Sequence, residues 1–213
     1  MENGSLRKTI NHYKSNEVHY STRAFYNQLS FLYPVINYFL KGQRKALIGE
    51  VNSVLPGKLL EIGIGNGSHI PLYTRHQIMG IDISERMLNK AKRFEDNRIE
   101  LQLMDGEHLS FAEASFDYVV LSHVLAVTKD PDQLLGQVHK VLKPGGQLFI
   151  LNHFTPGNWL RWVDWAFQPL SSLFHFKSSF HLHQVKGLQQ FTLLKQTELG
   201  TCSYYKLLIF CKP

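Results

Sequence analysis

The sequence KLLEIGIGNG, at residues 58–67, holds the clearest pattern in the chain. Its apolar first half predicts a short buried strand, and the glycines after it predict a tight turn that opens a helix. Glycine in such a turn accepts positive φ and lets the backbone approach a ligand closely. The spacing of Gly63, Gly65 and Gly67 is G-x-G-x-G, whereas dinucleotide sites have G-x-G-x-x-G. Because the acid Glu61 stands just before the turn, the pattern favours a cationic ligand over a pyrophosphate.

Strands and helices alternate on the C-terminal side of this turn. Apolar runs predict strands at 58–62, 77–82, 99–104, 116–122, 146–152, 192–198 and 204–210. Helices are expected at 66–75, 84–92 and 130–142, with Ser84 as an N-cap and the breaker residues 143–146 as a stop. This alternation predicts an α/β fold with a parallel sheet covered on both faces. Ligands of such sheets bind at the carboxyl ends of the strands, near the topological switch point.

Two other regions differ in character from this alternation. Residues 6–20 and 22–54 have helical composition, with a break near Pro34, and predict an N-terminal helical cap (1–54) over the active site. The remaining residues, 55–213, form the expected core domain. It contains an aromatic-rich insert near 154–185, whose helical part is expected at 158–174 and holds Trp159, Trp162 and Trp165. This insert either packs on the sheet or docks on a membrane interface.

Charge gathers at the two ends of the chain, whose net charge is +6 over 213 residues. Residues 1–50 carry seven Lys and Arg against three Asp and Glu, residues 51–150 carry ten against twelve, and residues 151–213 carry six against two. Basic ends indicate an anionic partner, such as nucleic acid, anionic lipid or an acidic small molecule, or else plain solubility charge.

The cysteine and histidine usage indicates neither disulfides nor a metal site. Cys202 and Cys211 form no disulfide framework, and His175, His181 and His183 have no Cys or carboxylate close by. The start of the chain lacks the apolar region of a signal peptide, and no apolar run reaches the roughly 20 residues of a membrane span. We therefore expect a cytoplasmic protein, with peripheral contact at the inner face of the membrane as an additional possibility.

Two further acids follow the next two strands. Asp82 ends the second strand, nineteen residues after Gly63, where a carboxylate accepts from both hydroxyls of a ribose. Asp105 follows the third strand, placed to accept from an adenine amino group while Met104 packs on the ring. Acids at three successive strand ends predict a nucleoside that carries positive charge and no phosphate. S-adenosylmethionine fits this description.

The motifs EIGIGNG, GIDIS, LMDGE, FDYVVLSHVL and LKPGG, in that order, resemble the class I S-adenosylmethionine-dependent methyltransferases. The resemblance covers roughly residues 59–153 and implies a Rossmann-like sheet of seven strands, mostly parallel, with an antiparallel last strand. It also implies a set of cofactor-binding residues, namely Glu61, Gly63, Gly65, Gly67, Asp82, Ile83, Met104, Asp105, Gly106, Glu107 and Ser122.

A narrower resemblance concerns the acceptor. LSHVLAV, LKPGGQLFILNHF and the N-terminal YSTRAFYNQLSFLYPVI are similar to bacterial phosphatidylethanolamine N-methyltransferases and to ubiquinone/menaquinone C-methyltransferases. It implies a small-molecule or phospholipid acceptor and a tyrosine-bearing cap. In those families an Asp commonly follows the tyrosine at the place of Tyr26, whereas here Asn27 follows it.

Candidate catalytic residues are His123, His153 and Tyr26. Methyl transfer needs alignment of the nucleophile, exclusion of water and a base when the acceptor carries a proton. His123 and His153 follow the fourth and fifth strands, and Tyr26 belongs to the cap with Tyr13, Tyr20 and Tyr33. The alternative is structural: the histidines cap helices or bind carbonyls, and the tyrosines pack.

The favoured function is a methyltransferase acting on an amine, such as the phosphatidylethanolamine head group. The first alternative is methylation of a soluble metabolite or quinone precursor at nitrogen, oxygen or carbon. A nucleic-acid methyltransferase and a non-catalytic binder of S-adenosylmethionine are the others. Against nucleic acid, the chain shows no basic stripe, and LSHV stands where base-methylating enzymes have an N-P-P-Y type sequence.

Overall fold

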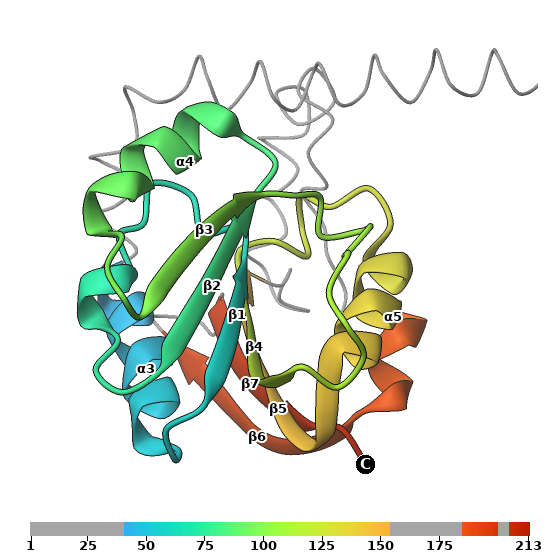
Figure 1. Ribbon diagram of the computed structural model, residues 1–213. Helices are drawn as coiled ribbons and strands as arrows, with labels where there is room; N and C mark the ends of the chain where they lie inside the picture. Colours follow the sequence, from blue (N-terminus) through green and yellow to red (C-terminus); the bar gives the residue numbers. More distant parts are fainter. Residues whose placement is uncertain (1–40, 154–184, 200–204) are drawn as a thin grey trace, which may run out of the picture.

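The computed structural model describes residues 41–153, 185–199 and 205–213, which form a single seven-stranded sheet with helices on both faces (Figure 1). The strands are β1 (Lys58–Ile62), β2 (Gln77–Asp82), β3 (Ile99–Leu103), β4 (Phe116–Ser122), β5 (Leu142–His153), β6 (Thr192–Leu199) and β7 (Tyr205–Cys211). All seven expected strands are present, and their bounds differ from the expected ones by a few residues at most, except at the start of β5.

The strand order is β3-β2-β1-β4-β5-β7-β6. The first five strands pair in parallel, and β7 runs antiparallel to both β5 and β6. The mostly parallel sheet with an antiparallel last strand is therefore confirmed. From β1 the chain moves outward to β3 and then returns to place β4 on the other side of β1. The switch point lies between β1 and β4, where ligands of such sheets bind.

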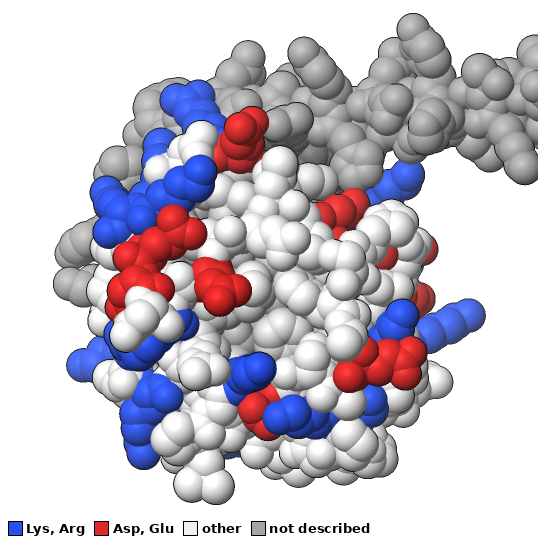
Figure 2. Space-filling model, in the orientation of Figure 1, with Lys and Arg blue, Asp and Glu red and all other residues white. Residues whose placement is uncertain are grey.

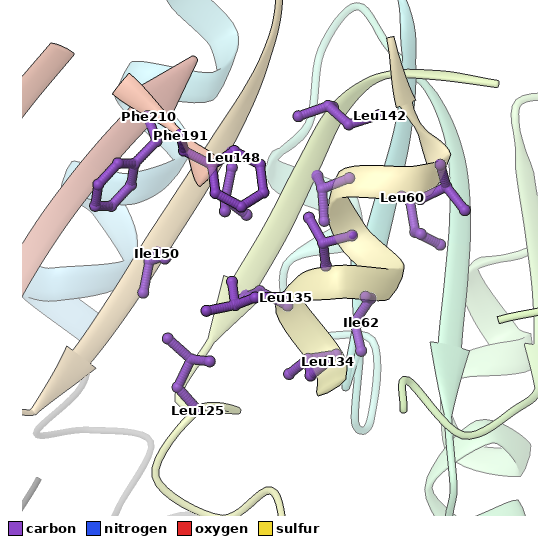
Figure 3. Close-up of a cluster of buried hydrophobic side chains, with 14 of the residues drawn as sticks. Leu60, Ile62, Leu125, Leu134, Leu135, Leu142, Leu148, Ile150, Phe191 and Phe210 are labelled. Carbon is purple, nitrogen blue, oxygen red and sulfur yellow. The ribbon is translucent and has the colours of Figure 1, made fainter. Parts of the chain in front are cut away.

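Two apolar clusters, one on each face, hold the sheet between helices. On one face α5 (Pro131–Val141) and the 3-10 turn η5 (Lys186–Gln190) pack through Leu134, Leu135 and Leu188. Figure 3 shows this cluster, in which α5 side chains meet β1 and β5 residues such as Leu60 and Ile150. On the other face lie α3 (Lys41–Ser53) and α4 (Glu85–Ala91), and the fully buried Leu47 of α3 belongs to that cluster. The period-two alternation of the strands supplies both faces.

The helix caps agree with their local sequence. Ser84 has extended backbone angles, and its hydroxyl accepts from the Met87 backbone N–H at 3.4 Å, so the expected N-cap of α4 is confirmed. The helix ends at Ala91 and continues as the 3-10 turn η3 (Lys92–Phe94). Asp130 caps α5 in the same way, by accepting from Gln133 N–H at 3.0 Å.

The prediction of a helix at 66–75 is wrong. Only η2 (Ile70–Leu72), a 3-10 turn, forms there. Gly67 has a φ of +74°, which no α-helix contains, and Pro71 has no N–H to donate. The side chains of His69 and Tyr73 both reach back to Glu61, and this shape replaces the expected helix.

The helix stop expected before residues 143–146 is confirmed, because α5 ends at Val141, close to the expected end at 142. The expected turn between helix and strand is wrong, because β5 begins at Leu142 and continues through these positions. They form an irregularity of the ladder instead, because the β4–β5 register shifts between Phe116 and Tyr118. Gly145 has a φ of +75° there, and its N–H donates to the Lys212 carbonyl at 2.9 Å.

Several expected features lie outside the described residues. They are Tyr26 and the cap up to residue 40, the aromatic insert at 154–184 with its tryptophans, and Cys202 with His175, His181 and His183. The division into a cap (1–54) and a core (55–213) stays a prediction, although α3, the end of the expected cap, packs on the sheet. Within residues 41–153, 185–199 and 205–213, no helix combines the length and apolarity needed to cross a bilayer.

Candidate functional site

The glycine loop after β1 is anchored to β2 and closely packed against the segment after β4. Gly63 N–H and Ile64 N–H both donate to the Ile81 carbonyl, at 2.8 and 3.0 Å. Gly63 has a φ of +72°, and a Cβ placed on it would lie 2.6 Å from Val124 Cγ2. A glycine is therefore required at this position on two independent grounds, conformation and space.

Gly65 and Gly67 complete the loop. Gly65 has a φ of +59°, so its N–H turns toward β2 and donates to Asp82 Oδ2 at 2.8 Å. A Cβ on Gly67 would lie 2.9 Å from the Ala91 Cβ and 3.0 Å from Phe94. The glycines thus set the loop between the end of β2 and the α4–η3 segment.

Asp82 stands at the carboxyl end of β2 with both oxygens engaged by backbone. Besides Gly65 N–H on Oδ2, it accepts Ser84 N–H on Oδ1 at 2.8 Å. Burial raises the pKa of the Asp82 carboxyl, and the negative charge of Glu61 adds to the rise. The hydrogen bonds from Ser84 and Gly65 oppose it. Ile83, next in the chain, has 39% of its surface exposed and is available to a ligand.

Glu61 is almost completely buried, with 1% exposure. His69 Nδ1 lies 2.5 Å from Glu61 Oε1, and the Tyr73 hydroxyl donates to Oε2 at 2.9 Å. Burial, followed by the charge of Glu61 and this hydrogen bond, raises the pKa of Tyr73 well above its ordinary value, so the phenol keeps its proton. His69 and Tyr73 were not singled out from the sequence. The available signal was the need of a buried carboxylate for donors nearby.

The segment after β3 continues the same edge of the sheet. Met104 N–H donates to the Asp82 carbonyl at 3.2 Å, and the Met104 side chain is partly buried against the apolar cluster on the α5 face of the sheet. Asp105 Oδ1 accepts Glu107 N–H at 2.9 Å. A Cβ on Gly106 would lie 2.6 Å from Ile62 Cγ2, so this turn sits directly on the end of β1.

Glu107 joins this segment to the one after β4. Its Oε1 accepts from the Thr128 hydroxyl at 3.1 Å and from the backbone N–H groups of Lys129 and Asp130 at 2.9 and 3.2 Å. Gln133 Nε2 donates to the Glu107 carbonyl at 3.0 Å. The carboxylate is 8% exposed and its described contacts are internal. Glu107 therefore holds the two segments together, and its expected contact with the cofactor stays a prediction.

Ser122 ends β4 on the other side of the switch point, and His123 follows it directly. His123 N–H extends the ladder by donating to the Leu151 carbonyl at 2.7 Å, and the His123 φ is +60°. His153 lies at the end of β5 opposite Tyr205. Only its backbone is described, so its expected catalytic role stays a prediction.

The structure therefore brings the cofactor candidates to one edge of the sheet. Glu61 lies near the carboxyl end of β1, Asp82 ends β2 and Asp105 follows β3. These three strands are neighbours. Burial, and after it the negative charge of Glu61, raises the pKa of Asp82 at the glycine loop. A ligand with positive charge and hydroxyl donors fits such an edge, because it relieves the repulsion and supplies the donors. In the described part of the chain, no group of His, Cys, Asp and Glu is arranged to hold a metal ion.

Comparison with known proteins identifies the class of enzyme. Residues 60–150 match the family model described as "Methyltransferase domain". The chain carries a methyltransferase domain of the S-adenosylmethionine-dependent class. The matched range of this methyltransferase domain contains every cofactor candidate, from Glu61 to Ser122, together with His123.

Two curated relatives narrow the comparison. This chain is 29% identical to the phosphatidylethanolamine N-methyltransferase of Cereibacter sphaeroides over 161 residues, which is 72% of this chain and 79% of that protein. It is also 32% identical over 118 residues to the ubiquinone/menaquinone biosynthesis C-methyltransferase of Desulfotalea psychrophila. That match covers 53% of this chain and 48% of the relative, so the chain spans about half the length of the second relative.

A solved structure shares the fold. The phosphoethanolamine N-methyltransferase 2 of Haemonchus contortus, in complex with S-adenosyl-L-methionine, superposes with a TM-score of 0.66 at 19% identity. The superposition covers 80% of this chain and 52% of that one. It confirms the Rossmann-like arrangement of the methyltransferase domain.

Proposed function

We propose that this protein transfers a methyl group from S-adenosylmethionine to the amine nitrogen of a phosphatidylethanolamine head group. The methyltransferase class follows from the family match, and the acceptor is the new step. The similarity to a phosphatidylethanolamine N-methyltransferase along 79% of that relative carries it. The placement of His123 at the carboxyl end of β4, across the switch point from the acidic strand ends, supports it.

The cofactor roles are assigned along the edge of the sheet. Asp82 would accept the ribose hydroxyls, Ile83 and Met104 would contact the adenine, and Asp105 would accept its amino group. Gly63 and Gly106 let their turns pack closely against Val124 and Ile62, which fixes the loops beside the ligand, and Ser122 would face the ligand from β4. Glu61 would contribute the negative charge that favours the cationic end. S-adenosylmethionine, when bound, supplies a methyl group on a positively charged sulfur, which needs no further activation.

The chain's own residues then handle the acceptor. An amine attacks only through a free lone pair, so a protonated head group must lose a proton before the new N–C bond forms. His123 is the candidate base, because its ordinary pKa lies near neutrality. Burial and the closely packed loops exclude water and align the nucleophile, which is worth roughly 7–11 kcal/mol of barrier in favourable cases.

Basic side chains lie on the surface beside the cofactor edge, with acidic ones among them. Arg86, Lys90, Lys92 and Arg93 are all exposed on α4 and η3, and Figure 2 shows blue side chains over this segment with red ones next to them. Basic side chains near a bilayer are attracted to anionic lipid by about 1 kcal/mol each. Arg7, Lys8, Lys14, Arg161 and Lys177, which belong to the two basic ends of the chain, lie outside the described residues. This surface supports a peripheral encounter with anionic membranes.

A second candidate acceptor is a quinone precursor methylated at carbon. The relative from Desulfotalea psychrophila favours it, at 32% identity over a shorter match. A phenolic ring would also need a base, so His123 would act as the base with either acceptor. The two candidate functions differ in the atom that accepts the methyl group, nitrogen or carbon, and an assay with both acceptors separates them.

The test is transfer of a labelled methyl group by the purified full-length chain. Vesicles of phosphatidylethanolamine mixed with phosphatidylglycerol are compared with vesicles in which phosphatidylcholine replaces the amine lipid. Soluble phosphoethanolamine and a demethylated quinone are the other acceptors. Label in the ethanolamine lipid alone supports the proposal, and label in the quinone alone supports the second candidate. Label only in the soluble amine overturns the lipid acceptor.

Membrane contact is measured separately. Co-sedimentation with the phosphatidylglycerol vesicles should weaken as salt rises, because exposed charges are screened within about 8 Å at physiological ionic strength. If the protein stays in the supernatant at low salt while methylating soluble phosphoethanolamine, the chain meets its acceptor away from the membrane.

A further inference from the structure

His123 has an unusual backbone for a side chain of its size. Its φ is +60°, a region that favours glycine, and among the described residues only Ala114 shares this feature without being glycine. Ala114 lies before β4, at the amino end of the strand, whereas His123 lies directly after it. Such outliers persist where surrounding contacts hold them, and they gather at functional sites.

The contacts around His123 come from three sides. Its N–H donates to the Leu151 carbonyl of β5 at 2.7 Å. Val124, next in the chain, fills the space above Gly63 of the cofactor loop. On the third side is Tyr205, the first residue of β7, whose ring meets the His123 ring edge-on, with centroids 5.8 Å apart and an interplanar angle of 89°.

Tyr205 reaches this place because β7 is antiparallel. A parallel strand ends at the carboxyl edge of the sheet, so an antiparallel one begins there. Tyr205 pairs with His153 of β5 on one side and with Leu199 of β6 on the other, which fixes its position on both. An edge-on pair of this kind contributes about as much as a good apolar contact and prefers one ring orientation.

We propose that Tyr205 is a positioning residue for His123: its ring fixes the imidazole at the carboxyl end of β4, facing the acceptor, and completes the site from the antiparallel strand. The proposal rests on the proposed function, in which His123 is the base. The proposal assigns the positioning role to the ring of Tyr205 and not to its hydroxyl. The two parts separate experimentally.

The experiment compares Tyr205→Leu with Tyr205→Phe, which keeps the ring. The chain offers a matched control in Tyr118, which lies in β4 away from the carboxyl end of the strand. Its ring meets the His76 ring edge-on, with centroids 5.1 Å apart. Tyr118→Leu therefore breaks a contact of the same kind at a different place. Each variant is measured for acceptor kcat/KM, S-adenosylmethionine affinity by calorimetry, thermal unfolding and the imidazole NMR signals of His123, assigned with His123→Asn.

We expect Tyr205→Leu to lower acceptor kcat/KM by about 10- to 100-fold, the scale of a misplaced catalytic group. Cofactor affinity should be unchanged, and the His123 signals should shift. Tyr205→Phe should restore the rate and leave those signals nearly in place, and Tyr118→Leu should change stability alone. The proposal is overturned if Tyr205→Leu keeps its rate, if Tyr118→Leu loses as much, or if the His123 signals do not move.

A failure of the proposed function looks different. In that case the wild-type protein methylates no tested amine, yet the NMR comparison of Tyr205→Leu with Tyr205→Phe still reports whether the ring holds His123. If the His123 signals shift in Tyr205→Leu but not in Tyr205→Phe, the Tyr205 ring does hold His123, and only the role of His123 as a base is abandoned. Unmoved signals discard the positioning role itself.

Discussion

Among single residues, Asp82 combines two opposing demands. In the proposed site it would be ionised to accept both hydroxyls of a ribose, yet it is partly buried beside the negative charge of Glu61. Both influences raise its pKa, and the hydrogen bonds from Gly65 and Ser84 offset only part of this. The ligand-free protein therefore carries an energetic cost at this residue at neutral pH, which bound positive charge would relieve.

This cost gives a pH-dependent prediction. A folded-state pKa above the ordinary value of 3.8 means that folded protein binds the Asp82 proton more tightly than unfolded protein. The contribution of Asp82 to the free energy of unfolding is fully present below 3.8 and is lost as pH rises through the raised pKa. Urea unfolding across this range should show a downward slope for wild type that is reduced in Asp82→Asn. Glu113→Gln, at an exposed acid, is the control and should keep the slope.

The positive φ of His123 changes how its role is tested. Replacement by alanine combines loss of the imidazole with backbone strain of about 1–3 kcal/mol. His123→Gly and His123→Asn tolerate this φ and remove the imidazole without adding backbone strain. Both should fold normally, bind cofactor as wild type does and methylate about 100-fold more slowly or worse. Rates within a few-fold of wild type in both variants would show that alignment suffices without a base here.

The buried Glu61 depends on its donors. Tyr73→Phe removes the hydroxyl from Glu61 Oε2 and leaves a buried carboxylate oxygen short of a partner, which costs about 1–3 kcal/mol in the free energy of unfolding. In Tyr118→Phe the lost donor served an exposed backbone carbonyl, that of Leu55, which water can satisfy instead. Chemical denaturation of both should show a clearly larger loss in Tyr73→Phe. Equal losses would mean that Glu61 does not need this donor.

Sequence patterns predicted Glu61, Asp82 and Asp105 because each follows an apolar run that can only be a buried strand. They did not predict His69 and Tyr73 as partners of Glu61. Residues 66–75 had a helical composition, and a helix would point those two side chains elsewhere. Tyr205 was missed for a different reason: nothing local to β7 indicates that its first residue will lie against the end of β4.

At the scale of elements, the glycine loop and the segment after β4 form one closely packed unit, since Val124 occupies the space that Gly63 leaves open. Glu107 ties the segment after β3 to the same unit through residues 128–130. The strands were predictable from their apolar runs, whereas the loops that join them were not. Their shapes depend on contacts between segments far apart in the chain, as the irregularity at residues 143–146 also shows.

Two glycines provide a matched test of this unit. Gly63→Ala and Gly145→Ala both force a side chain into the left-handed region, with φ of +72° and +75°. The added Cβ meets Val124 at position 63 and nothing within 4 Å at position 145. Both variants should lose about 1–3 kcal/mol of stability from strain, but only Gly63→Ala should also lose cofactor affinity in calorimetry. Loss of affinity in Gly145→Ala would contradict a local role for the loop.

At the scale of the whole molecule, the strand order brings together residues from motifs that lie far apart in the chain. The order β3-β2-β1-β4-β5-β7-β6 brings the acids after β1, β2 and β3 to one side of the switch point and His123 after β4 to the other. The antiparallel β7 then adds Tyr205 to the same edge. Figure 1 shows α3 and α4 on one side of the sheet and α5 on the other, leaving this edge to the loops.

The most direct measurement is calorimetric titration of S-adenosylmethionine into the full-length wild-type protein, Asp82→Ala and the control Glu113→Ala. The acidic edge predicts saturable binding to wild type and to the control. It predicts affinity weaker by about 1–3 kcal/mol in Asp82→Ala, the scale of hydrogen bonds to a charged acceptor. Circular dichroism shows that the variant is folded. No binding to wild type, or unchanged affinity in folded Asp82→Ala, would contradict the site placed at the carboxyl ends of β1, β2 and β3.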